Sequence, residues 1–439
     1  MQLQNAARPP TSDSDFSIMK IAIDPVGSAH SEPDLRNVRL WSYADKFAAL
    51  MAVSLPWSTT IFGISTILWL ITLAGAIDVR QLGRLVTRLP SALPITLFCL
   101  AVVGMFWADV PWGARVHATG SLIKLLAIPL LIYQFNRSEN GITILLSFLA
   151  SCTALLFLSW LNWFEPRTVL FPVKALGVPV KNWITQGVEF VLCIFGSAAL
   201  AIVMWHDRRP YEAFGLALLA VAFLLNMVFV ASASRTSLVS IPALLLISTF
   251  RYLGWKRSLT VYVILSVLVG LAWLTAPNLR NRLESIQDEY TSYTRGQKTS
   301  VGLRLEYWTN SLKFISMAPL VGHGTGSIRS LFEREVGQKS ADSPEIVANP
   351  HNQTLYFAIE WGVIGIILLY SMWITHFLMF TEMRWIAWLG IIVVSQNILD
   401  SLFNSHLSDY VEGWIYVMGV GIAAGMVTRT RKEPVARFR

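Results

Sequence analysis

A histidine follows an Asn-Pro pair where a long polar stretch gives way to an apolar run. The residues are Asn349, Pro350 and His351. Asparagine caps helix N-termini and proline suits the first helical position, so the pattern predicts His351 in the first turn of a helix. The amide N–H groups and positive dipole end there favour anions and keep a nearby imidazole neutral. Such an imidazole can accept a proton from an attacking hydroxyl. The alternative is that His351 lies at the helix N-terminus at the interface without a catalytic role.

Two arginines are candidates for binding phosphate. Arg235 lies in a break of small and hydroxyl residues between two apolar runs. Its guanidinium fork suits a pair of phosphate oxygens, although an arginine near a membrane boundary is often an interfacial anchor. Arg304 lies in a segment, 303–315, whose apolar residues have helical spacing, which predicts an amphipathic helix. Glu306 is two residues away and cannot share a helix face with Arg304, so a local ion pair does not explain it.

Weaker candidates have simpler explanations. Arg280 and Arg282 flank the end of an apolar run and could equally be interfacial anchors. The glycine-rich sequence at 322–326 lacks the strand and βαβ unit that a nucleotide-binding loop needs, so a tight turn is expected, with His323 structural. Lys124 lies inside an apolar run and is expected to serve a polar cavity or to pair with an acid such as Glu189.

The sequence predicts neither a metal site nor a cofactor. Asp400, His406 and Asp409 lie close together in the chain but lack a metal-ligand spacing. The three cysteines lie inside apolar runs and offer neither a disulfide framework nor a ligand set.

The composition is that of a membrane protein. Of 439 residues, 54% are hydrophobic and 14% charged, whereas soluble domains carry about 25% charged residues. The apolar runs have the length that a helix needs to cross a bilayer. The expected fold is all-α and polytopic, with about twelve transmembrane helices near 46–60, 61–77, 91–107, 117–134, 141–163, 184–205, 213–232, 236–250, 258–275, 352–376, 384–399 and 411–428.

Arginine and lysine positions predict the topology through the positive-inside rule. They place both termini in the cytoplasm, and this placement explains most of the +8 net charge without a nucleic-acid partner. The long loop between the ninth and tenth spans, with nine basic and eight acidic residues, is then periplasmic and contains helices. Within it, 289–300 is the candidate mobile segment or lid. The predicted organisation is a cytoplasmic segment 1–45, spans one to nine in 46–276, a periplasmic loop 277–350, spans ten to twelve in 351–428, and a cytoplasmic tail 429–439.

Residues 351–365 resemble a family signature. His351 and Asn352, nine further residues, Gly362 and Gly365 read H-N-x9-G-x2-G. This is similar to the signature of the O-antigen ligase and polymerase superfamily of bacterial envelope enzymes, and the turn at 319–326 resembles one in that superfamily. The architecture agrees over most of the chain, whereas the specific motifs lie near 235 and in 302–365.

The resemblance implies a GT-C type glycosyltransferase of the inner membrane, inverting and metal-independent. It would move O-antigen from undecaprenyl diphosphate to a lipid A–core sugar at the periplasmic face, among membrane lipids. Arg235 and Arg304 would bind the diphosphate, with Arg282 and Asn352 as further substrate contacts, and His351 would orient or deprotonate the acceptor hydroxyl.

Three alternatives stay open. An O-antigen polymerase would join repeat units that are both carrier-linked, and a protein-glycosylating relative would share the motif but tends to carry an extra soluble C-terminal part. A lipid-linked sugar flippase or a transporter could have a similar number of spans. A transporter should show repeats and midplane acids, whereas this chain concentrates polar residues on one face.

Overall fold

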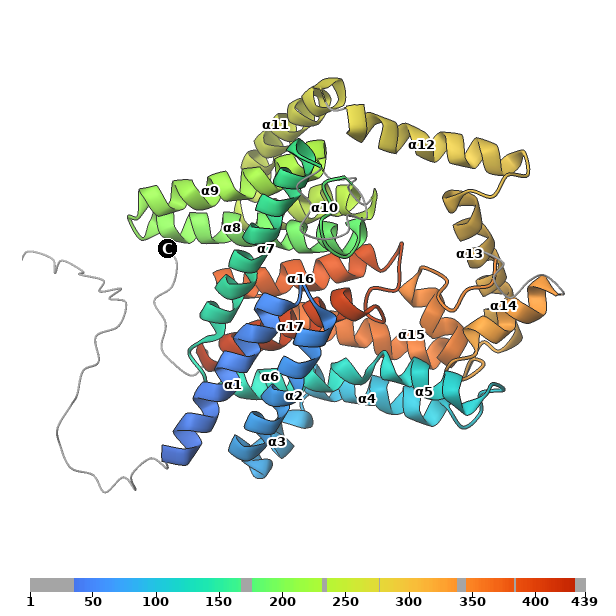
Figure 1. Cartoon of the computed structure of the whole chain (residues 1–439). Coiled ribbons are helices and arrows are strands. Elements are labelled where there is room, and N and C mark those ends of the chain that lie inside the picture. The colour runs from blue at the N-terminus through green and yellow to red at the C-terminus, as the bar shows by residue number, and fades with distance from the viewer. Residues whose placement is uncertain are drawn as a thin grey trace, which may run out of the picture.

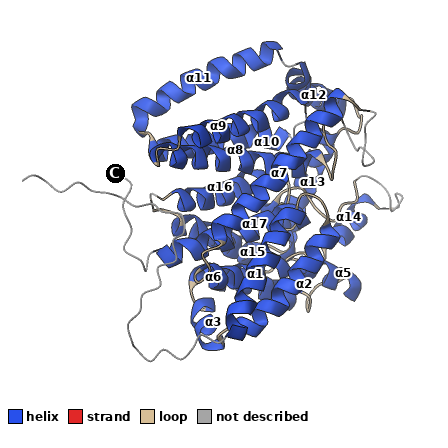
Figure 2. Cartoon of the chain, turned by 60° about the vertical axis from the view of Figure 1, so that its left-hand side comes forward, coloured by secondary structure: helices blue, strands red, loops and turns tan. Residues whose placement is uncertain are grey.

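The computed structural model describes residues 35–166, 176–230, 235–275, 277–337, 345–382 and 384–430, and every regular element in them is helical (Figure 2). The helices that precede the long polar stretch are α1 (Leu35–Ser54), α2 (Thr59–Ala76), α3 (Val79–Val86), α4 (Leu89–Gly104), α5 (Trp112–Gly120), η1 (Ile123–Leu126), α6 (Ala127–Phe135), α7 (Gly141–Phe164), α8 (Trp183–His206), α9 (Pro210–Leu225), η2 (Asn226–Val230), α10 (Arg235–Tyr252) and α11 (Gly254–Thr275). Those that follow are α12 (Pro277–Thr294), α13 (Ser300–Met317), α14 (Ile328–Val336), α15 (Gln353–Met379), α16 (Trp385–Asp400) and α17 (Tyr410–Thr430).

The last three helices form the centre of the molecule. In Figure 1, α15, α16 and α17 lie between α4 and α6 on one side and α8 and α9 on the other. Of the seven helices long and apolar enough to cross a membrane, α17 is the most enclosed, with 89% of its most apolar window buried. Small residues permit this packing: the Cα atoms of Gly421 and Gly425 face Leu131 and Phe135 of α6 so closely that a methyl group would collide with them.

The all-helical, multi-span prediction is confirmed, but the count of twelve is not. Within the described ranges, seven helices are long and apolar enough to cross a membrane, or up to nine if the bent pairs α3–α4 and α5–α6 each count as one span. The other three of the twelve predicted spans correspond to α1, α10 and α16. Helix α1 covers 35–54 rather than 46–60 and carries Arg39, Asp45 and Lys46, whereas the apolar parts of α10 and α16 are short.

The long polar stretch contains helices, as the sequence predicts. Helices α12 and α13 extend outward from α11 and return toward α14 and α15 (Figure 1). The 289–300 segment, expected to be mobile, comprises the end of α12 and a hydrogen-bonded turn. Thr299 Oγ1 donates to the Glu289 carbonyl at 2.9 Å, and Val301 N donates to the Glu289 carboxylate at 3.1 Å.

Candidate functional site

His351 lies just before α15, in a turn that an asparagine side chain stabilises. The Asn349 Oδ1 atom accepts a hydrogen bond from His351 N at 2.9 Å, and His351 adopts a left-handed φ of 55°. The residue that caps α15 is Asn352, whose Oδ1 accepts from Leu355 N at 3.0 Å. The prediction that Asn349 is the cap and His351 lies in the first turn is therefore wrong. The side chain of Asn349 closes the turn at His351, so the helix starts later.

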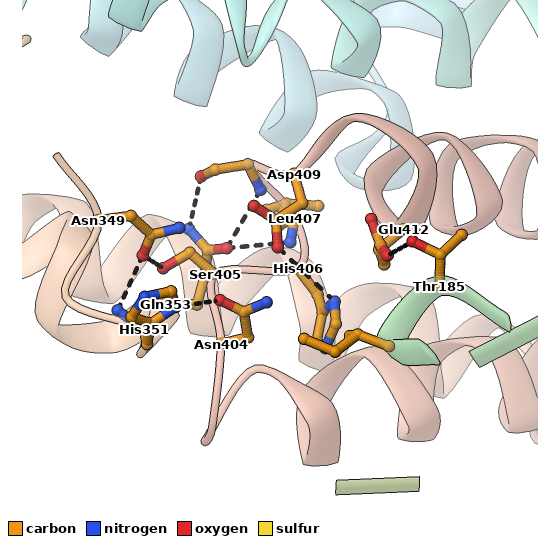
Figure 3. Close-up of polar contacts among 12 residues, drawn as sticks. Thr185, Asn349, His351, Gln353, Asn404, Ser405, His406, Leu407, Asp409 and Glu412 are labelled. Carbon is orange, nitrogen blue, oxygen red and sulfur yellow. Dashed lines mark hydrogen bonds and ion pairs between the residues drawn. The ribbon is translucent and has the colours of Figure 1, made fainter. Parts of the chain in front are cut away.

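The imidazole of His351 is fixed by a partner from the segment between α16 and α17, which is hereafter the 401–409 segment. The Nδ1 atom lies 2.8 Å from Asn404 Oδ1 (Figure 3). An amide oxygen accepts hydrogen bonds, so Nδ1 carries the proton and Nε2 keeps its lone pair. The hydrogen bond therefore selects the tautomer in which Nε2 can accept a proton.

A network of polar contacts joins the entry of α15 to the 401–409 segment. The buried Gln353 side chain accepts from Leu407 N at 2.9 Å and donates to Ser408 Oγ at 3.0 Å. Asn352 Nδ2 donates to the Leu402 carbonyl at 3.0 Å, and Ser405 Oγ donates to Asn349 Oδ1 at 2.7 Å. Because the contacts come from both sides, Asn404 is held against His351 (Figure 3).

The surroundings of His351 keep it neutral. Burial lowers the pKa of the imidazole below its usual value, the nearby charges of Arg304 and His406 lower it further, and the hydrogen bond with Asn404 acts in the opposite direction. An unperturbed histidine titrates near pH 6.5, so a lowered pKa leaves His351 uncharged at neutral pH.

Helix α13 brings a cation and an aromatic ring to the same place. Thr299 caps α13 through Gly302 N at 3.1 Å, and the half-buried Arg304 follows in the first turns, close enough for its charge to act on His351. Tyr307, one turn further on, has its ring centroid 6.0 Å from that of His351. Its ring packs edge-on against Phe332 of α14. Neither Tyr307 nor Asn404 was predicted from the sequence; the position of Tyr307 one turn after Arg304 was the signal available for it.

The remaining predicted site residues differ in how far the structure describes them. Arg235 is the first residue of α10 and Arg282 lies in α12, but both side chains lie outside the described residues. Both polar groups of Asn352 contact backbone, so it shapes the entry to α15.

Gly362 of the signature allows the 319–326 turn to lie against α15. Gly362 has a φ of 58° and interrupts α15, and a Cβ there would lie 2.5 Å from the Leu320 carbonyl group. Val363 N donates to the Pro319 carbonyl at 2.9 Å across this interruption. His323 Nε2 lies 2.8 Å from the Phe314 carbonyl, which supports the structural role expected for it. The turn therefore joins α13 to α15.

Lys124 is buried and interacts with acidic residues, as expected, but Glu189 is not among them. Its Nζ donates to the carbonyls of Ser408 and Asp409, and its charge interacts with the carboxylates of Asp409 and Glu412. Glu189 instead interacts with the charge of Lys181. The sequence could not predict this partnership, because Lys124 and the 401–409 segment are almost 300 residues apart.

Comparisons with known proteins relate this site to a family. A protein of Haemophilus influenzae described as uncharacterized is 26% identical over 259 residues, which span 54% of this chain and 64% of that protein. The family model described as O-antigen ligase matches residues 218–370. This segment includes Arg235, Arg304 and His351. The match confirms the predicted resemblance of the chain to the O-antigen ligase superfamily.

Proposed function

We propose that this protein is an O-antigen ligase, a GT-C type glycosyltransferase that moves O-antigen from undecaprenyl diphosphate to a sugar of lipid A–core. The reaction would take place at the periplasmic face of the bacterial inner membrane, with both termini in the cytoplasm. The family match over residues 218–370 supports a lipid-linked glycan as substrate. The observation that carries the proposal is the pair of His351 and Arg304, a neutral imidazole with a lone pair on Nε2 beside a guanidinium.

The proposed role of the arginines is to bind the diphosphate. Arg304 and Arg235 would contact its oxygens, with Arg282 as a further contact from α12. Negative charge grows on the diphosphate as it leaves, and guanidinium groups in a partly dehydrated site stabilise it more than they would in water. We therefore expect transfer to be unaffected by added Mg²⁺.

In the proposed step, the acceptor hydroxyl attacks the anomeric carbon opposite the diphosphate. A carbon–oxygen bond forms to the acceptor while the bond between the anomeric carbon and the diphosphate oxygen breaks, and undecaprenyl diphosphate leaves with the electron pair. The hydroxyl proton passes to Nε2 of His351. Attack from the opposite face inverts the anomeric configuration. Asn352 would act by holding the turn that presents His351.

The first experiment is transfer by purified protein from a glycan-bearing undecaprenyl diphosphate to lipid A–core. We expect His351→Ala to lower the rate by about 10²- to 10⁴-fold, the range for loss of a general base. The matched control is His117→Ala, because His117 is exposed on α5. Wild-type transfer by a folded His351→Ala protein would refute the catalytic role.

An O-antigen polymerase is the alternative, since it uses the same donor and differs in its acceptor. Deleting the gene separates the two functions. Loss of a ligase leaves long glycans on the carrier, whereas loss of a polymerase leaves lipid A–core bearing one repeat unit. Elongation of carrier-linked glycan by the purified protein, without transfer to lipid A–core, would favour the polymerase.

A further inference from the structure

A small cavity beneath the 401–409 segment has a mostly apolar wall that also includes several polar side chains. Its volume is about 10 Å³, and its walls include Gln396, Asp400, His406 and Glu412. A space of this size holds a single water or ion. His406 is 1% exposed, and neither ring nitrogen has a hydrogen-bond partner among the described residues. Gln396 Oε1 and Asp400 Oδ2 are likewise buried without partners there.

The buried imidazole of His406 lies beside two carboxylates, Asp409 and Glu412, that could bind a cation together with it; His406 and Glu412 also line the cavity. Asp409 Oδ2 lies 3.8 Å from His406 Nδ1, and ligand atoms of His406, Asp409 and Glu412 all lie within 4.8 Å of one another. Figure 3 shows these three residues on the 401–409 segment and the first turn of α17.

Carboxylates outnumber ammonium groups around the cavity. Asp400, Asp409 and Glu412 interact with one another or with His406. The ammonium groups that act on them are those of Lys124 and, at Glu412, Lys181. The excess of negative charge favours a bound cation. Thr185 Oγ1 donates to one oxygen of Glu412 at 2.6 Å and leaves the other for a ligand.

We propose that His406, Asp409 and Glu412 bind one divalent transition-metal ion. The sequence did not predict a metal site, because Asp400, His406 and Asp409 alone lack a metal-ligand spacing and Glu412 lies one turn further on. One imidazole and two carboxylates favour ions such as Zn²⁺ or Mn²⁺ over Ca²⁺. Zn²⁺ ligands lie about 2.0–2.2 Å from the metal, so the three side chains need to converge slightly. Asp400 would accept from the second nitrogen of His406, as carboxylates do beside metal-bound histidines.

The ion would hold the 401–409 segment against α17. Asn404 lies two residues before His406, so the position of His351 depends on this segment. The inference does not rest on the proposed ligase activity. Metal bound here would be structural, which is compatible with transfer that does not need Mg²⁺ at the diphosphate.

The test is equilibrium dialysis of the purified full-length protein against Zn²⁺ and, separately, Mn²⁺. We expect one ion per chain in the wild type and a rise in melting temperature when metal is added. His406→Ala should lose at least tenfold in affinity, whereas His117→Ala should bind like the wild type. Reconstitution with Co²⁺ should give a visible absorption band that His406→Ala lacks.

A second variant separates a metal ion from the ammonium of Lys124 as the resident cation. If the cavity binds metal, Lys124→Met should bind it more tightly, because one repulsive charge is gone. If Lys124 is the cation, the wild type should bind no metal and Lys124→Met should melt at a lower temperature that metal does not restore. That second result, or equal binding by the wild type and a folded His406→Ala protein, would overturn the proposal.

Discussion

The neutrality of the His351 imidazole, together with its contact with Asn404, predicts how transfer depends on pH. Proton transfer needs the uncharged form of His351. The kcat/KM for transfer should therefore fall as pH drops through the lowered pKa of His351 and stay level above it. Asn404→Asp would place a carboxylate beside the ring, raise the pKa of His351 and move the acid limb to higher pH. A pH profile of transfer measures this, and an unchanged acid limb in Asn404→Asp would show that His351 does not control it.

Arg304 should act on the leaving group. Arg304→Gln is expected to lower kcat by about 10²- to 10³-fold, as loss of one transition-state donor does. Arg304→Lys should retain part of the rate, because it keeps the charge but loses the planar fork. Arg329→Gln is the control, since Arg329 is in the same polar stretch and contacts Glu333 at 2.9 Å. Equal losses in Arg304→Gln and Arg329→Gln would argue for a general charge effect.

Among the helices, the interruption of α15 at Gly362 predicts that a side chain added at this position lowers the stability of the protein. Gly362 has a φ of 58° and a ψ of −149°, a backbone conformation open essentially to glycine. Gly362→Ala should therefore cost about 1–3 kcal/mol and adds a clash with the Leu320 backbone. We expect a lower melting temperature in detergent. Gly63→Ala in α2 meets no atom within 4 Å and should be neutral or slightly stabilising. If Gly362→Ala melts like the wild type, the close contact with the 319–326 turn is absent.

The sequence predicted the elements better than their contacts. Hydropathy located α2, α7, α8 and α15 because each is a continuous apolar run. Three of the twelve predicted spans, those at α1, α10 and α16, are not confirmed, because α1 carries charged residues and the apolar parts of α10 and α16 are short. At the site, the sequence pointed to His351 as a candidate general base. It did not predict Asn404, which comes from a segment about 50 residues away, or that Asn352 rather than Asn349 caps α15. Such choices are decided by tertiary contacts that local patterns do not contain.

For the whole molecule, the proposed topology can be read by labelling single cysteines. In a variant without Cys99, Cys152 and Cys193, we expect Gln287→Cys on the exposed face of α12 to react with an impermeant maleimide added outside the inner membrane. Arg84→Cys on α3 should react only after that membrane is permeabilised. The reverse pattern would place the long polar stretch in the cytoplasm and contradict a periplasmic reaction.

Because of the left-handed backbone at His351, the residues that favour folding at this position differ from the residue that favours activity. Glycine adopts this conformation without steric cost, and asparagine adopts it more readily than most residues. A library at position 351 sorted for folded protein alone should therefore be enriched in glycine and asparagine. Under selection for transfer the same library should return to histidine, so histidine at this position would be the residue that evolution retains against the preference of the backbone.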